Sequence, residues 1–440
     1  MLNLMKSLKL ILYLFIIVTF IEPLTAQTNT ATDSLSLNKI LNQVINNFPA
    51  IKKNEQELNA ANARIGMAKT GYLPDISVNA NDTYLGPVST ISLGPQSFSL
   101  FPANNWSAAL DYTQTVFDFG KTTKNINLEN QSKEMVNTST ELIKQRLSLS
   151  VVNIYYNILF IQEALSIKDK ELYTLKQHLT YIEKKKETGS ATQYEVLTTK
   201  VRISTIENQK TDLLNSLKVQ TCQMNSLMGQ PEKTSLLVKN ELQQIQVQNP
   251  TEQLLASADK TRNELKMAQQ KTALSELKYK VVENQNMPSL KFYASGGIKN
   301  GLFPDMYKGT WNFAVGVGVH IPIFDANHTK YNLLQVKADI ESNKEDVELT
   351  HRTIVNEVVE SQANMESALE KIKQSEFQFV QAQQAYNLAE ISFKDGVITN
   401  LELLDTSTSL SEAGLSVLKA KIDYSLSLLK LKIALGERIY

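Results

Sequence analysis

One segment of this chain occurs twice in the same register. Residues 189–197 read GSATQYEVL and residues 396–404 read GVITNLELL, a shift of 207 positions (396 − 189). The same shift carries the Phe-Asp pair at 117–118 onto the Phe-Asp pair at 324–325, with no insertion between them. A tandem repeat of this length predicts two copies of one structural unit packed about a pseudo-symmetry axis.

The amino terminus predicts export. Two lysines precede an apolar run over residues 10–21, and the small-residue segment 24–26 (LTA) then stands before Gln27. This order is typical of a cleavable signal peptide, which we place at residues 1–26. The alternative is an uncleaved membrane anchor, but the apolar run is shorter than the ~20 residues that a spanning helix needs.

Each half opens with a helix and continues into strands. A helical stripe of apolar residues predicts one helix over 37–69 and its counterpart over 251–283, where Thr251 follows Pro250 and can cap the helix. The apolar period then changes from 3.6 to 2, which indicates strands. The connections at 86–105 and 300–308 are rich in Gly, Pro, Ser and Asn and are expected to be surface loops. The predicted strands cover about 74–86, 105–118, 288–299 and 310–323.

The strands have one apolar and one small or polar face. In the last strand, Val317 belongs to the apolar face, whereas Gly316 and His320 belong to the other. About ten residues per strand with aromatic side chains near the ends is typical of a membrane β-barrel. Four strands cannot close a barrel, and open edges are not tolerated in lipid, so several chains must combine. Three copies give twelve strands, enough to begin to leave a passage.

Two long helical hairpins complete the halves. Residues 120–188 and 327–395 contain no proline and would extend roughly 100 Å as uninterrupted helices. Each run ends at a glycine, Gly189 or Gly396, and then turns into a second helix. The alternative for this pattern is an exposed two-stranded coiled coil.

In combination these features resemble the TolC-like outer-membrane efflux proteins. The strongest local match is residues 393–405 (FKDGVITNLELLD). The resemblance implies a mainly α-helical homotrimer, whose 12-stranded outer-membrane β-barrel continues into a periplasmic α-helical barrel. It implies the exit duct of a tripartite efflux or type I secretion system, docked to a periplasmic adaptor (membrane fusion) protein and an inner-membrane transporter. The two repeats then cover 27–229 and 251–440, joined by an equatorial linker at 230–250.

The resemblance assigns a periplasmic gate to Glu402, Asp405 and Phe393. Glu402 and Asp405 are three residues apart and share a helix face. Three copies would place six carboxylates around a narrow opening, where like-charge repulsion raises the pKa of some of them. The alternative is a solvated helix face. Phe393 stands where a tyrosine is common in the family, so that tyrosine's hydrogen bond is absent.

The resemblance also assigns adaptor docking to the helical tips. Gly189 and Gly396 match the tip glycines, where a positive φ lets the chain reverse. Thr192 and Thr399 can cap the helices that follow. This chain has Ile398 where the family often has a basic residue, so its closed state must be held in another way. The predicted docking residues are Gly189, Thr192, Glu195, Gly396 and Thr399.

The sequence contains no motif for catalysis. The four histidines lack HExxH spacing, and no phosphate-binding loop or nucleophile elbow is present, so we expect no enzyme activity, cofactor or metal. His320 is expected to be an ordinary lumen residue rather than a metal ligand. The chain carries 45 basic and 45 acidic residues, so its charge indicates no nucleic-acid partner. The competing functions are a nonporous periplasmic coiled-coil scaffold and an exported helical enzyme, and only a barrel would require lipid or detergent.

Overall fold

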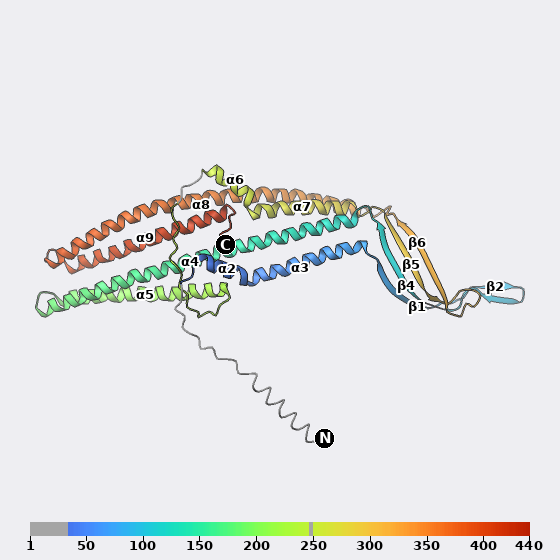
Figure 1. Ribbon diagram of the computed structural model, residues 1–440, viewed down its shortest axis with the longest axis horizontal. Coiled ribbons are helices and arrows are strands. Elements are labelled where there is room, and N and C mark those ends of the chain that lie inside the picture. Colours follow the sequence, from blue (N-terminus) through green and yellow to red (C-terminus); the bar gives the residue numbers. More distant parts are fainter. Residues whose placement is uncertain (1–33, 246–249) are drawn as a thin grey trace, which may run out of the picture.

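The computed structural model describes residues 34–245 and 250–440, and the predicted signal peptide lies outside them. The chain forms a long rod with a sheet at one end and helices along the rest (Figure 1). The first half contains α2 (Leu37–Asn47), α3 (Pro49–Lys69), β1 (Asp75–Tyr84), β4 (Asn104–Phe117), α4 (Lys121–Glu187) and α5 (Gln193–Met228). The second half contains α6 (Thr251–Thr261), α7 (Asn263–Glu283), β5 (Ser289–Lys299), β6 (Thr310–His320), α8 (His328–Lys394) and α9 (Asn400–Ala434).

The halves match element by element. Helices α4 and α8 each have 67 residues and begin 207 positions apart (328 − 121). Helices α2 and α6 instead begin 214 positions apart (251 − 37), so the first half has seven more residues in its strand region (214 − 207). Within the surface loop predicted at 86–105, the chain forms a small hairpin of β2 (Thr90–Leu93) and β3 (Gln96–Ser99).

The predicted helix over 37–69 is wrong in one respect, because the chain breaks it at Phe48. Phe48 is extended (φ −68°, ψ 129°), and Pro49 begins the second helix, α3. Proline has no N–H and clashes with the preceding turn, so it is tolerated at the start of a helix and not inside one. The first half therefore has two helices, α2 and α3, in this region.

The predicted helix over 251–283 is also two helices, although no proline separates them. The break falls at Arg262, which is extended (φ −68°, ψ 119°). The Arg262 guanidinium donates to the Ala434 carbonyl at 3.0 Å and to the Glu357 carboxylate at 2.7 Å, which ties the break to the end of α9 and to α8. Thr251 is not the cap, because Pro250 occupies that position.

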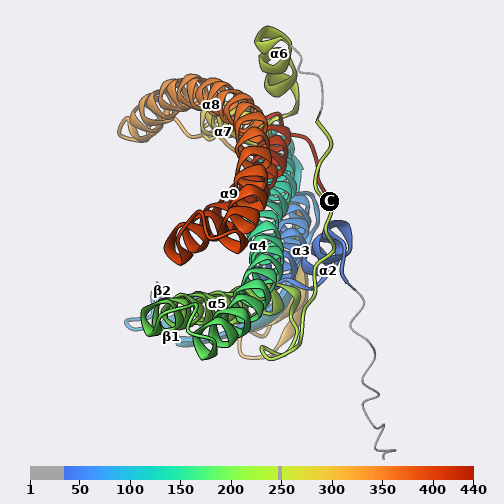
Figure 2. The same cartoon turned by 90° about the vertical axis from the view of Figure 1, so that its left-hand side faces the viewer.

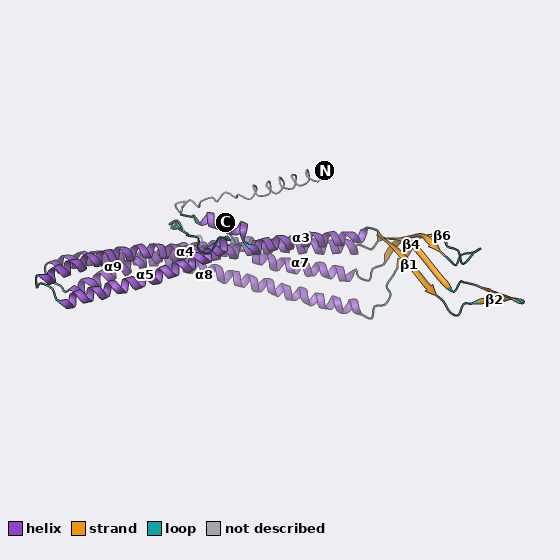
Figure 3. Cartoon of the chain, turned by 90° about the horizontal axis from the view of Figure 1, so that it is seen from below, coloured by secondary structure: helices purple, strands orange, loops and turns teal. Residues whose placement is uncertain are grey.

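The helices lie side by side in one curved layer (Figure 2). Helix α4 packs against α3 and α5 on one side and against α7 and α9 on the other, and α8 packs against α7 and α9. The layer is therefore four helices wide, with α3 and α5, and likewise α7 and α9, following each other along the rod (Figure 3). Within residues 34–245 and 250–440, no helix is both long and apolar enough to cross a membrane.

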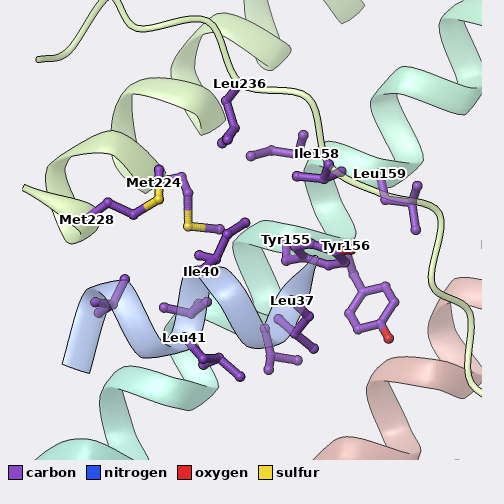
Figure 4. Close-up of a cluster of buried hydrophobic side chains, with 14 of the residues drawn as sticks. Leu37, Ile40, Leu41, Tyr155, Tyr156, Ile158, Leu159, Met224, Met228 and Leu236 are labelled. Carbon is purple, nitrogen blue, oxygen red and sulfur yellow. The ribbon is translucent and has the colours of Figure 1, made fainter. Parts of the chain in front are cut away.

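A hydrophobic core at mid-rod fixes α2 against the long helices. An 11-residue helix is marginal by itself. Helix α2 is held because Ile40 and Leu41 are buried among Tyr155 and Tyr156 of α4 and Met224 of α5 (Figure 4). Each fully buried aliphatic side chain contributes about 1.5–3 kcal/mol. The tyrosine hydroxyls donate to the backbone carbonyls of Lys239 and Glu241, so the connection after α5 is fastened to the same core.

The four long strands form one antiparallel sheet in the order β1-β4-β5-β6. The register places Val78 opposite Leu110 and Phe292 opposite Val317, so the apolar residues share one face. Val317 is 66% exposed, and none of the described α-helices covers this face. Strands β1 and β6 are the sheet's two edges, each paired on one side within the chain.

The strand prediction needs one adjustment. Strand β6 ends at His320 rather than at residue 323, because Pro322 cannot donate a ladder hydrogen bond. On the polar face, Gly316 lies under Tyr293, and a Cβ there would come 2.5 Å from the tyrosine Oη. Gly316 therefore keeps the space in which that ring lies.

Candidate functional site at the helical tips

The two hairpin turns lie together at the end of the rod opposite the sheet (Figure 1). Gly189 has φ 75° and Gly396 has φ 77°, which confirms the predicted left-handed turns. The turns also satisfy carbonyls left free at the ends of α4 and α8. Ser190 N donates to Lys185 O, and Val397 N donates to Ser392 O, both at 2.8 Å.

Identical capping boxes start the two returning helices. Thr192 accepts from Glu195 N, and the Glu195 carboxylate accepts from Thr192 N at 2.6 Å. In the second repeat, Thr399 accepts from Glu402 N, and the Glu402 carboxylate accepts from Thr399 N at 2.7 Å. The predicted caps are confirmed, and they give Glu195 and Glu402 the same structural role.

This role changes the interpretation of Glu402. The backbone and hydroxyl hydrogen bonds from Thr399 lower the pKa of Glu402 below its ordinary value. Within one chain the pKa thus moves in the direction opposite to the one predicted for a ring of carboxylates. The reason is that the carboxylate is turned back to its own helix start, where N–H donors stabilise its charge.

The other predicted gate carboxylate makes a different contact. Asp405 of α9 forms an ion pair with Arg202 of α5, with 3.0 Å between Oδ1 and Nη2. Within one chain, the Glu402 carboxylate therefore caps its own helix, and the Asp405 carboxylate pairs across to the first hairpin. Arg202 was not among the predicted site residues.

A buried hydrogen-bond network joins the two hairpins beside this ion pair. Asn400 of α9 is only 2% exposed. Its Nδ2 donates to Thr199 Oγ1 of α5 at 3.2 Å, which leaves its Oδ1 to accept from His178 Nε2 of α4 at 2.6 Å. Burial lowers the pKa of His178 and outweighs the opposing effects of Asn400, Glu195 and Glu390. The histidine is therefore kept neutral near pH 7, and its Nε2–H is donated to Asn400.

Phe393 fills the space between the hairpins. It is buried, and its ring contacts His178 edge-on with 5.2 Å between ring centroids. Lys185 Nζ lies 5.3 Å from the Phe393 ring centroid. Ile398, which stands where a basic residue was expected from the resemblance, packs against the same cluster. The second tip is thus fixed to the first by apolar contact where a charged side chain is absent.

These contacts between hairpins come from positions at which the two repeats differ. The capping boxes recur in both halves, whereas most of the joining residues do not recur at the 207-residue shift, Thr199 with its counterpart Thr406 being the exception. The pairs are His178 and Ala385, Gln193 and Asn400, Thr198 and Asp405, Arg202 and Ser409, and Lys186 and Phe393. The repeated positions therefore build each tip, and the divergent positions join one tip to the other.

The junction of α4 with α8 and α9 is incompletely filled. A cavity of about 350 Å³ and a smaller one of about 240 Å³ follow each other along it. The smaller cavity lies nearer the tip and is lined by His178, Tyr181 and Phe393, among others. Both are partly open at the surface of the chain, so the two hairpins do not close over this junction. Across the part of the chain that the structure describes, no group of three or more His, Cys, Asp or Glu residues is placed to hold a metal ion.

Comparisons with known proteins agree with this architecture. The family model described as outer membrane efflux protein matches residues 40–230 and 254–437. Outer membrane protein TolC of Escherichia coli (strain K12) is 23% identical over 401 residues, which covers 88% of this chain and 79% of that protein.

Two solved structures show the same fold. The outer membrane protein VceC of Vibrio cholerae aligns with a TM-score of 0.74 at 17% identity, covering 92% of this chain and 97% of that one. The CmeC outer membrane channel of Campylobacter jejuni aligns with a TM-score of 0.76 at 14% identity, covering 94% and 90%. The chain therefore belongs to the outer membrane efflux protein family and is located in the outer membrane, as its sequence predicted.

Proposed function

We propose that three copies of this outer-membrane efflux protein form the exit duct of a tripartite efflux or type I secretion system. The duct is a passive channel, gated at its helical tips. It docks there to a periplasmic adaptor protein and, through it, works with an inner-membrane transporter. The observation that carries the proposal is a four-stranded sheet with one uncovered apolar face and two edge strands, placed at the end of a helical rod.

The need to close the sheet into a barrel supports a trimer. An unpaired strand edge costs several kcal/mol for each backbone group left in lipid, so β1 of one chain must pair with β6 of another. Three chains give twelve strands, and they also place a layer of twelve helices around the same axis. Helix α4 alone has 67 residues and spans about 100 Å, so the duct would extend far beyond the bilayer into the periplasm.

The packing of the tips supports a gate. Helices α8 and α9 pack against each other more extensively than either packs against α4, and both cavities lie where this pair meets α4. Regions with few buried contacts open at lower free energy than cores do. The α8–α9 hairpin would therefore move as a unit, with Glu402 and Asp405 facing the passage and Phe393 leaving its buried position.

Exposed side chains at the tips support adaptor docking. Tyr194 and Leu197 follow the first turn, and Val397 and Leu401 follow the second, and all four are exposed apolar side chains. They lie next to the turn and cap residues Gly189, Thr192, Glu195, Gly396 and Thr399, which we propose as the docking site. A nonporous coiled-coil scaffold would also have such tips, but it would have no use for the uncovered apolar face of the sheet.

The test is stoichiometry together with conductance. Native mass spectrometry of the detergent-solubilised protein should give three chains, and the same preparation should conduct ions in planar bilayers. A monomer that stays folded and soluble without detergent would refute the duct and favour the scaffold. Co-purification from membranes should recover the adaptor and transporter, and it would also indicate the exported substrate.

A further inference from the structure

The small hairpin of β2 and β3 projects beyond the far end of the sheet, away from the helices (Figure 1). At its base, Leu85 N donates to Ala103 O at 2.7 Å. Further along, Leu100 N donates to Ser89 O at 3.0 Å, so the hairpin continues β1 and β4. A two-stranded hairpin is marginally stable by itself in water. This one therefore needs a contact with another part of the assembly.

The hairpin has one apolar and one polar face. Its register pairs Ile91 with Phe98 on one face and Ser92 with Ser97 on the other. Ile91 is 46% exposed and Phe98 is 53% exposed, so the apolar face is uncovered within the chain. Residues 83–110 contain no charged side chain, so a partner of this face would be recognised by apolar contact and not by ion pairs.

Lipid does not cover this face in the proposed duct. Strands β1, β5 and β6 have 10, 11 and 11 residues, which matches the apolar band of about 25 Å in a membrane barrel. The helices leave the sheet at its other end and extend into the periplasm. The hairpin therefore lies beyond the outer surface of the bilayer, where water surrounds it, and its apolar face requires a protein partner.

The loop between β5 and β6, residues 300–309, presents apolar side chains at the same end of the sheet. Phe303 is 80% exposed and Tyr307 is 71% exposed. The loop is ordered by its own hydrogen bonds, because Gly301 N donates to Met306 O at 2.7 Å and Tyr307 N donates to the Asp305 carboxylate at 3.1 Å. Its aromatic side chains remain exposed, so the loop leaves the hairpin of its own chain uncovered.

The proposed barrel brings this loop of one copy beside the hairpin of the next. Strand β1 ends at Tyr84 at the outer end of the sheet, and β6 begins there at Thr310. Pairing of β1 with β6 of the adjacent copy is antiparallel, which continues the alternation within the sheet. The hairpin and the adjacent copy's 300–309 loop therefore rise from neighbouring strands.

We propose that the apolar face of the β2–β3 hairpin packs on the 300–309 loop of the adjacent copy. Ile91 and Phe98 then lie against Phe303 and Tyr307 of a second copy of this chain. A covered aromatic side chain buries about 150–250 Å², so each of the three seams gains an apolar contact outside the membrane. The contact rests on the proposed trimer and adds to the strand pairing that closes it.

Cross-linking between chains tests the contact. Cys222 is the chain's only cysteine, so the full-length protein with Cys222→Ala provides the background. In this background, Phe98→Cys with Phe303→Cys should give linked dimers and trimers on a denaturing gel after a short bismaleimide is added to outer-membrane fractions. Ser97→Cys with Phe303→Cys places the first thiol on the polar face and should give mostly single chains. Phe98→Cys alone tests contact between two hairpins.

The cross-linked products decide which partner covers the face. Single chains from the Phe98 and Phe303 pair, or equal yields from the Ser97 and Phe303 pair, would overturn the contact. Dimers from Phe98→Cys alone would assign the face to a second hairpin, and a product of another mass would assign it to a different protein. Native mass spectrometry of the untreated protein reports the trimer separately. Trimers without the cross-link would overturn the contact alone, whereas an absence of trimers would overturn the duct as well.

The rate at which trimers dissociate in detergent gives a second measurement. Phe98→Ala removes a buried aromatic side chain from every seam, so it should speed dissociation on the order of ten-fold, as followed on native gels. Ser97→Ala changes the polar face of the same hairpin and should leave the rate unchanged. Equal rates for the two variants would overturn the contact.

Discussion

Replacing Asn400 by alanine tests what holds the two hairpins together. Asn400 bridges three helices, because it accepts from His178 of α4, donates to Thr199 of α5 and belongs to α9. It is the first residue of α9, where alanine is compatible with the helix and leaves the capping box of Thr399 in place. The substitution therefore removes the junction's hydrogen bonds without removing the helix.

The free-energy cost of Asn400→Ala can be compared with the cost of breaking the neighbouring ion pair. Asn400→Ala leaves the His178 N–H buried without a partner, which costs about 1–3 kcal/mol. That free energy corresponds to a change of about 5- to 150-fold in the balance between packed and separated hairpins. The Arg202–Asp405 pair is more exposed, with side chains 28% and 62% accessible, so Asp405→Asn should cost about 0.2–1 kcal/mol. The buried amide should thus hold the closed state more strongly than the carboxylate.

Single-channel recording in planar bilayers measures this difference. Asn400→Ala should raise the open probability well above that of Asp405→Asn. The repeat supplies the control, because Gln193 occupies the equivalent first position of α5, where its side chain is exposed. Gln193→Ala should leave gating unchanged. The reasoning fails if Asp405→Asn opens the channel as much as Asn400→Ala does, or if the control opens it too.

Three further predictions concern the sheet, the carboxylates and pH. Val317→Arg on the apolar face should cost roughly 2–4 kcal/mol and reduce membrane assembly, whereas Ala314→Ser on the polar face should not, as measured by the yield of trimer in outer-membrane fractions. The double substitution Glu402→Gln and Asp405→Asn removes six charges from a trimer, while glutamine at position 402 keeps the capping box. Cation selectivity and block by multivalent cations should therefore fall. Unchanged reversal potentials would indicate that the two carboxylates lie on a solvated helix face. Separation of the hairpins hydrates His178 and raises its pKa toward the ordinary 6.5, so the separated state binds more protons than the packed state. Conductance should therefore rise as the pH falls below about 6.5. A pH response that is retained in His178→Asn would assign the effect to another group.

The fold was largely predictable because its signals are local and repeated. Apolar periodicity separates the helices from the strands, and the positive-φ turns at Gly189 and Gly396 follow from glycine itself. The break at Phe48 was also predictable, because Pro49 follows it and begins α3. The break at Arg262 could not be predicted, because Arg262 donates a hydrogen bond to Ala434, 172 residues away, and no local sequence pattern indicates such a contact.

The site residues could be predicted only where their contacts are with sequence neighbours. The segments 192–195 (TQYE) and 399–402 (TNLE) both carry the T-x-x-E signature of a capping box, so the sequence contained the reason why Glu402 turns back toward its own helix. No comparable sequence signature marks Arg202, His178 or Asn400. Their contacts depend on the register in which one hairpin packs against the other, and that register is set by tertiary packing along the full length of α4 and α9.

The divergence between the repeats fits what the proposed gate would require. In the proposed trimer, six equivalent hairpins would surround the axis, and if all six made the same contacts they could only open or close together. A hairpin that moves against a fixed neighbour needs an interface whose two sides differ. The chain has such an interface, because His178 faces Asn400 across the junction while their repeat counterparts are Ala385 and Gln193. Residues that build a tip are therefore free to remain the same in both halves, and residues that join two tips are the ones on which gating can act.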